Sequence, residues 1–260
     1  YLFETDEPHF ADIERADIAQ LRVFLSGSGE LSFPDGKRYP NFPFSLFGPR
    51  MSASSVTLTG PVRLFGVGLL PTGWSALTKL SAANFANTLV DASIMVGVNT
   101  HESVAKLGAM ATIAEMAEAM TDTARQFEAR AENVPHWFIR AVDEWLEQRL
   151  SPDVADLEKT TGLSRRQIER MTKQIYGASP KLLQRKYRAL RTANAISNGN
   201  GDWQDFIDDA YYDQSHCIRE IKEFVGITPG AIKEHVSRLS ELTFGRSRLA
   251  GAVSPLSAQT

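Results

Sequence analysis

The chain has 260 residues, of which 43% are hydrophobic and 23% are charged, and its formal net charge is −3. This balance is typical of a globular protein, and no apolar run approaches the roughly 20 residues that cross a bilayer, so an integral membrane protein is not expected. The single cysteine excludes an internal disulfide. Together with the lack of a visible secretory leader, it predicts a cytoplasmic protein.

The first part of the chain predicts short β-strands separated by turns. The run LRVFLSGSGELSF leads into the turn PDGK, and SSVTLTGPVRLFGVGLL is rich in Val, Leu and Thr before it ends at Pro71 and Gly73. We therefore expect residues 1–110 to form a small β-rich domain with a sensory or regulatory role. Trp74, beside the turn, is expected to have a structural role in preference to lining a ligand pocket.

The period of the apolar residues changes after about residue 100, and residues 111–150 predict a helical connector. A stripe with the spacing 4-3-4-3-4 is formed by Ile113, Ala117, Met120, Ala124, Phe127 and Ala131. Pro135 suits the first turn of a second helix. The stripe has two interpretations, a dimer-forming helix pair or a helix packed on its own β-domain. Its shortness and its alanines favour the second.

A repeat organises the rest of the chain. The segment SRRQIERMTKQIYGASP (164–180) aligns with DQSHCIREIKEFVGITP (213–229) at a constant offset of 49 residues. The paired positions include the N-caps Ser164 and Asp213 and the helix-ending glycines Gly177 and Gly226. A short helix and a turn precede each copy, so the sequence predicts two helix-turn-helix units. We expect an all-α domain over 151–240, with a linking helix between the units and a loose tail over 241–260.

The only cysteine lies beside a serine and a histidine, as in some hydrolases. Cys217 aligns with Ile168, an apolar position that faces the core, and a free cysteine behaves as a small buried hydrophobe. Consecutive helix residues also point about 100° apart, so Ser215, His216 and Cys217 cannot converge on one reacting atom. The cluster predicts no catalytic site, and we do not expect an enzyme.

The strings GLSRRQIERM, GASP and YYDQSHCIREIKEFVGITP resemble the DNA-binding domain of the AraC family of bacterial transcription regulators, over about residues 140–238. The basic helix PKLLQRKYRALRTANAIS between the units is similar to the family's linking helix. At Ala210 the second unit departs from the family pattern, which has a turn glycine there. More weakly, GPVRLFGVGLLPTGWSAL resembles a short, poorly characterised domain that precedes some AraC-type domains.

The resemblance implies a transcription regulator that binds double-stranded DNA sequence-specifically and places two recognition helices in successive major grooves. It further implies, as partners, a small-molecule effector of the N-terminal domain, RNA polymerase and a second copy of the chain. The first residues of a recognition helix reach base edges, where Arg pairs with guanine and Gln with adenine. The expected DNA-binding residues are Arg165, Arg166, Gln167, Arg170 and Lys173 in the first unit, and Gln214, Ser215, His216 and Arg219 in the second.

Charge is distributed unequally between the units. Residues 164–191 carry nine positive side chains against one negative, whereas residues 202–223 carry seven negative against two positive. We therefore expect the first unit to supply most of the attraction to phosphates and the second to supply register. On the linking helix, the side chains expected to face away from the packed stripe and to be able to contact the DNA backbone are Lys181, Arg185, Lys186 and Arg188.

The five histidines show no metal-ligand spacing, so we expect neither a metal nor a cofactor. Two alternatives remain beside the DNA-binding regulator. One is a degenerate regulator whose acidic second unit binds DNA weakly or not at all and which acts through protein contacts. The other is an enzyme of the repair-alkyltransferase type, which would need a reactive cysteine outside the helix-turn-helix units, and the sequence has none.

Overall fold

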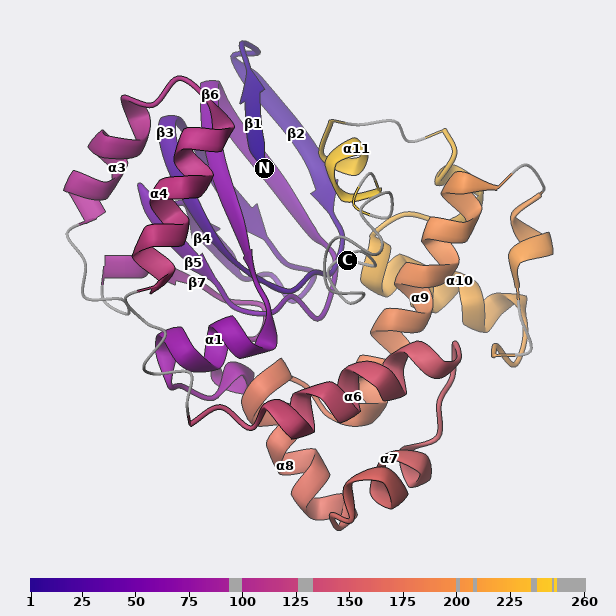
Figure 1. Cartoon of the computed structure of the whole chain (residues 1–260). Coiled ribbons are helices and arrows are strands. Elements are labelled where there is room, and N and C mark those ends of the chain that lie inside the picture. The colour runs from indigo at the N-terminus through magenta and orange to yellow at the C-terminus, as the bar shows by residue number, and fades with distance from the viewer. Residues whose placement is uncertain are drawn as a thin grey trace.

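The computed structural model describes residues 1–93, 100–125, 133–199, 202–207, 210–234, 238–244 and 246. Its first part is an antiparallel β-sheet with helices packed on it, and most of the later helices form a second body beside the sheet (Figure 1). The predicted α+β class, with a β-rich N-terminal part followed by helices, is confirmed.

The sheet has seven strands in the described residues and is built around one long antiparallel pair. The strands are β1 (Leu2–Thr5), β2 (His9–Glu14), β3 (Ala19–Ser32), β4 (Arg38–Pro40), β5 (Phe44–Phe47), β6 (Ser54–Leu69) and β7 (Leu89–Asp91). The order is β1-β6-β3-β5-β7, while β2 also pairs with β6 and β4 with β3. The β3–β6 register shifts on either side of Ser26, and such bulges bend a strand. On its other edge, β3 pairs with β5 in its first half and with β4 in its second.

Both faces of the sheet are covered, which is why the first six residues of β3 are all buried. On one face, Leu21 and Val23 pack with Trp74 of α1 (Pro71–Thr78) and with residues of η1 (Ala82–Phe85), α3 (Thr100–Gly108) and α4 (Ile113–Arg125). On the other face, Phe24 belongs to a cluster that includes Leu239 of α11 (Arg238–Phe244). Trp74 is 1% exposed and its indole donates to the Leu80 carbonyl at 3.0 Å, in agreement with a structural role.

Helix α4 packs on its own domain, but of the described residues in the predicted apolar stripe only Met120 packs against the sheet cluster. Met116 is fully buried against the sheet, whereas Ile113 is 46% exposed and Ala117 is also exposed. Alanines lie on both sides of this helix, so their spacing could not decide which side is covered. Phe127 and Ala131, the last two residues of the stripe, lie outside the described residues.

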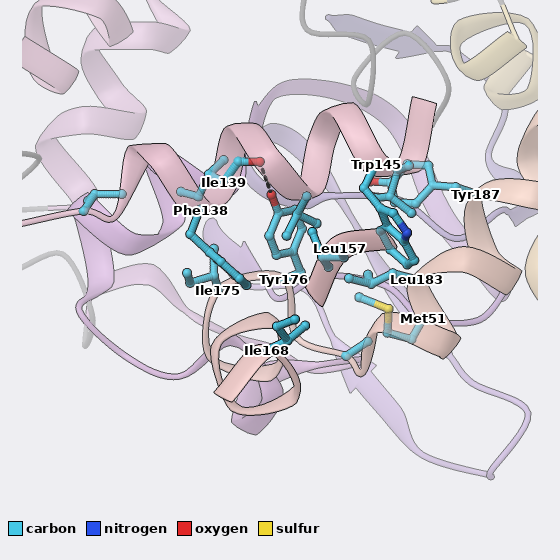
Figure 2. Packing of buried hydrophobic residues seen from close by; sticks show 14 of the residues in the cluster. Met51, Phe138, Ile139, Trp145, Leu157, Ile168, Ile175, Tyr176, Leu183 and Tyr187 are labelled. Atoms are coloured by element: carbon cyan, nitrogen blue, oxygen red, sulfur yellow. Dashed lines mark hydrogen bonds between the residues drawn. The ribbon is translucent and has the colours of Figure 1, made fainter. Parts of the chain in front are cut away.

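The second body is built around two apolar clusters. Its helices are α6 (His136–Gln148), α7 (Val154–Thr161), α8 (Arg165–Tyr176), α9 (Pro180–Asn198) and α10 (Gln214–Val225), with the 3₁₀ turns η2 (Trp203–Phe206) and η3 (Pro229–Ala231). In the first cluster, Phe138 and Trp145 of α6 pack on Ile168 of α8 and Leu183 of α9 (Figure 2). The second joins α9 to α10 and contains Cys217, which is fully buried as predicted.

The C-terminal segment returns to the sheet. We expected a loose tail from residue 241, but α11 runs to Phe244 and packs beside β2. Arg238 donates to the Glu4 carbonyl at 3.1 Å, and the Arg246 guanidinium lies 2.9 Å from the Asp17 carboxylate. The remaining tail residues, 247–260, lie outside the described part of the chain.

Candidate nucleic-acid interface

The first unit consists of α7, a left-handed turn and α8. The Asp153 side chain accepts from the Ala155 amide at 3.0 Å and caps α7, and Gly162 ends it at φ 68°. Helix α8 then starts at a capping box, in which the Ser164 amide donates to the Gln167 side chain at 3.0 Å. Gly177, at φ 85°, ends α8. These local signals fix where the helix presents its first residues.

The second unit repeats the longer helix but shortens the first. Helix α10 has 12 residues like α8, begins after Asp213, whose carboxylate accepts from the His216 amide at 2.6 Å, and ends at Gly226 with φ 91°. The expected first helix is only a single 3₁₀ turn, η2, of four residues. Ala210, where the family pattern has a glycine, is not among the described residues with positive φ. The second unit therefore has its own turn geometry.

The exposed faces of α8 and α10 carry most of the side chains expected at DNA. On α8 these are Arg165, Arg166, Gln167, Arg170 and Lys173, all of which are exposed. On α10, Gln214, Ser215 and Arg219 are exposed. Two of these residues also have partners within the chain, because Gln167 takes part in the capping box and Lys173 pairs with Glu169 at 2.8 Å.

His216 differs from the other expected contacts because its ring is turned into the protein. Its side chain is 31% exposed, and Nε2 lies 3.2 Å from Oε1 of Glu220, one helical turn further along α10. The Tyr212 amide donates to Nδ1 at 3.3 Å. Because Nδ1 accepts this proton, the imidazole proton belongs on Nε2, toward the carboxylate.

The basic side chains of the linking helix α9 are largely engaged inside the protein, which corrects the expectation that they face the DNA backbone. Lys186 is 1% exposed and Arg188 is 6% exposed. Arg185 pairs with Glu220 at 2.7 Å and with Glu223 at 2.6 Å. Lys181 alone of the four expected backbone contacts is exposed.

These internal contacts reduce the number of charges that the two units expose. Of the nine cations between residues 164 and 191, five are exposed, namely Arg165, Arg166, Arg170, Lys173 and Lys181. Two carboxylates of the second unit, Glu220 and Glu223, pair with arginines of the linking helix. Ion pairs between the linking helix and α10 therefore neutralise part of the charge difference that the sequence shows between the two units.

The N-terminal domain contacts the C-terminal end of each longer helix. Gly177, after α8, lies against Pro49 and Ala82, and Gly226, after α10, lies against Ile13 and Ala53. The Ala16 amide donates to the Phe224 carbonyl at 2.7 Å, and the Ala53 amide to the Glu223 carbonyl at 2.9 Å. Both units are thus held on one domain at equivalent positions of the repeat.

Two buried ionisable groups in this region have shifted pKa values. Burial lowers the pKa of Lys186 to about 7, and its Nζ donates to the Asp17 carbonyl at 2.6 Å. Burial raises the pKa of Asp143 in α6 to about 6, although the Tyr176 hydroxyl lies within hydrogen-bond distance, 2.7 Å, of its carboxylate. Each shift reflects the cost of placing a charge at a packed junction.

Among the described residues, no group of three or more His, Cys, Asp or Glu side chains could hold a metal ion. Burial raises the pKa of the Cys217 thiol to about 11, so the thiolate that a nucleophile requires is disfavoured. No helix in the described ranges is long and apolar enough to cross a membrane.

No protein-family model matches this chain, and no curated protein matches it. Crystal structures of ToxT from Vibrio cholerae are similar in fold. An apo ToxT variant from strain SCE256 gives a TM-score of 0.49 at 9% identity over 90% of this chain and 100% of that one. ToxT from strain O395 gives 0.48 at 10% identity over 88% and 99%.

Proposed function

We propose that the chain is a transcription regulator of the AraC type that binds double-stranded DNA sequence-specifically through α8 and α10. The observation that carries this proposal is the structural repeat. Two 12-residue helices, offset by 49 residues and capped at both ends, each present an exposed, arginine-containing N-terminal face. That is the part of a recognition helix that enters the major groove.

The residues that we expect to contact DNA lie on the exposed faces of α8 and α10. We assign base or phosphate contacts to Arg165, Arg166, Gln167, Arg170 and Lys173 of α8, and to Gln214, Ser215 and Arg219 of α10. Helix α8 exposes more cations than α10, so the first unit supplies the larger share of phosphate attraction. The partners we propose for this regulator are an effector of the N-terminal domain, a second copy of the chain and RNA polymerase, and we propose no catalysis.

Binding of the purified protein to DNA from upstream of its own gene, compared with scrambled DNA over a salt series, tests the proposal. We expect Arg166→Ala and Arg219→Ala each to weaken specific binding, by roughly 5- to 150-fold if the arginine reads a base. Arg38→Ala, which removes an exposed arginine from β4, is the matched control and should bind as the native chain does.

Two results would contradict the proposal in different ways. Equal binding to native and scrambled DNA, with a steep salt dependence, would leave only backbone attraction. A footprint over one half-site, with no response to Arg219→Ala, would favour the degenerate regulator, whose second unit no longer contacts DNA.

A further inference from the structure

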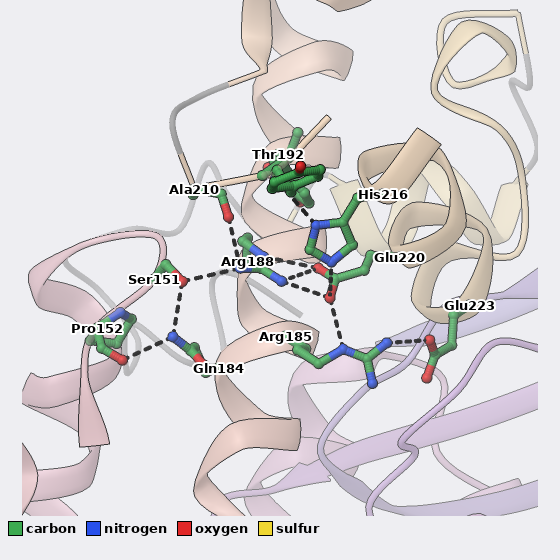
Figure 3. A network of polar contacts seen from close by, with 12 residues as sticks. Ser151, Pro152, Gln184, Arg185, Arg188, Thr192, Ala210, His216, Glu220 and Glu223 are labelled. Atoms are coloured by element: carbon green, nitrogen blue, oxygen red, sulfur yellow. Dashed lines mark hydrogen bonds and ion pairs between the residues drawn. The ribbon is translucent and has the colours of Figure 1, made fainter. Parts of the chain in front are cut away.

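The most completely buried carboxylate of α10 lies at a junction between helices. The Glu220 side chain is 1% exposed, and three basic groups surround it: Arg185 at 2.7 Å, Arg188 at 2.6 Å and the His216 ring at 3.2 Å (Figure 3). Arg188 binds both carboxylate oxygens, a bidentate geometry that fixes orientation as well as distance. Two of these basic groups belong to α9, so the carboxylate ties α10 to the linking helix.

Arg188 extends this junction beyond the two helices. Its Nη1 atom donates to the Ala210 carbonyl at 2.9 Å, in the turn before α10, and to the Ser151 hydroxyl at 3.1 Å, in the loop before α7. One turn earlier on α9, the Gln184 amide donates to the same Ser151 hydroxyl and to the Pro152 carbonyl, each at 2.9 Å. Two consecutive turns of α9 therefore bind the loop before α7, in the first unit, and helix α10, in the second.

We propose that Glu220 is a positioning residue that fixes α10 on α9, and with it the spacing of the two recognition helices. We further propose that His216 serves this junction and does not read a DNA base. Both ring nitrogens of His216 already have partners within the chain, at Glu220 and at the Tyr212 amide. The base-reading residues of the second unit are then Gln214, Ser215 and Arg219.

On the proposed role, the buried pair of Glu220 and Arg188 contributes to the arrangement of the two helices more than to the free energy of unfolding. Replacing such a pair by apolar residues is often neutral for stability, whereas removing one partner leaves an uncompensated buried charge. For two linked DNA-reading helices, arrangement matters because simultaneous engagement is lost when the geometry does not match the two sites. This consequence at DNA rests on the proposed function, but the positioning of α10 does not.

The first arm of the test measures the spacing without DNA. Spin labels are placed on exposed positions of the two helices, Gln174→Cys on α8 and Lys222→Cys on α10, and the distance between them is recorded by pulsed electron resonance. Cys217 is fully buried and is checked as an unlabelled background. We expect a narrow distance distribution in the native background and a broader or displaced one in Glu220→Gln.

Two further variants make this arm decisive. Glu223→Gln is the matched control, because Glu223 lies on the same helix and also pairs with Arg185, but its side chain is 41% exposed. It should keep the narrow distribution. The double variant Glu220→Leu with Arg188→Met removes the buried carboxylate and its buried arginine together and replaces them with apolar side chains, while Arg185 keeps Glu223 as a partner. It should therefore fold even if Glu220→Gln does not. A narrow, undisplaced distribution in this double variant, or equal broadening in Glu223→Gln, would overturn the positioning role.

The second arm measures binding to DNA whose two half-sites are separated by different numbers of base pairs. Glu220→Gln and His216→Ala should lose roughly a hundredfold in affinity for the preferred spacing and should bind an isolated first half-site as the native chain does. If the native chain does not distinguish its operator from scrambled DNA, the proposed function fails, while the distance arm still decides the role of Glu220. A loss of sequence preference at one base pair in His216→Ala, with spacing preference intact, would show that His216 reads a base.

Discussion

Gly177 and Gly226, which are 49 residues apart, end helices α8 and α10 in the same left-handed conformation, and both lie against the N-terminal domain. A Cβ added at Gly177 would come within 2.9 Å of the Pro49 side chain, and one at Gly226 within 2.9 Å of Ala53. The left-handed conformation by itself favours glycine at a helix end. At both positions, the glycine that ends the helix also contacts the N-terminal domain.

We expect Gly226→Ala to destabilise the protein by about 3 kcal/mol or more, measured by urea unfolding. The left-handed conformation costs a residue with a Cβ roughly 1–2 kcal/mol, and the contact with Ile13 and Ala53 adds a steric penalty. Gly36→Ala is the matched control, because Gly36 has φ 86° but nothing within 4 Å of the added carbon. Equal losses in the two variants would show that the domain contact contributes nothing.

Lys186→Met is expected to remove a pH dependence of stability that the native protein has. Below pH 7 the lysine is charged in both folded and unfolded chains, and the folded chain carries the full cost of burying that charge. Between the folded pKa of about 7 and the unfolded value of 10.5, the unfolded chain binds more protons, so native stability rises with pH.

The free energy of unfolding should therefore rise by about 2 kcal/mol more in the native chain than in Lys186→Met between pH 6.5 and 8.5. The Asp17 carbonyl keeps the Arg50 amide as a donor at 3.0 Å, so the substitution leaves no unpaired acceptor there. Lys181→Met, an exposed lysine of the same helix, should follow the native profile. A rise in Lys186→Met equal to that of the native chain would assign the pH dependence to other groups.

Local signals were sufficient to predict the first unit and the longer helix of the second, whereas the polar contacts between the helices depend on residues that are distant in sequence. The caps, the ending glycines and the burial of Cys217 follow from neighbouring residues and from the repeat, so they could be predicted. The burial of Lys186 and Arg188 could not, because their partners Asp17 and Glu220 lie 169 and 32 residues away. A count of charges along the chain treats such pairs as independent and so overestimates the exposed positive charge.

The β-domain was predicted as a class but not in its topology. Alternating strands and turns indicate a sheet, whereas the pairing of β3 with β6 along their length joins residues that are distant in sequence. The docking of Ala16 and Ala53 on α10 through backbone amides has no side-chain signature at all. The sequence marked Ala210 as a departure in the turn of the second unit, but it did not predict that a 3₁₀ turn at Trp203–Phe206 replaces the expected first helix.

The Cys217 thiol should be inert to a thiol-specific disulfide reagent in the folded protein and should react fully after denaturation. It is fully buried, and its raised pKa keeps it protonated at neutral pH. Lys222→Cys, which places a thiol on the exposed face of the same helix, provides the comparison and should react at once. Rapid reaction of Cys217 in the native chain would mean that α10 leaves α9 readily, against the fixed arrangement described above.

Asp143→Asn is expected to stabilise the protein above pH 6 and to remove an acid-side pH dependence. The folded pKa is about 6 and the unfolded value is 3.8, so the folded chain binds more protons between these values. Native stability should therefore fall as the pH rises through this window, by up to about 3 kcal/mol, and then level off. Asparagine is uncharged at every pH and still offers an oxygen to the Tyr176 hydroxyl.

Thermal unfolding at pH 4.5 and 7.5 measures the effect, with Asp122→Asn, whose side chain is 62% exposed, as the control. A variant less stable than the native chain at pH 7.5 would show that the ionised carboxylate is needed to hold α6 on α8.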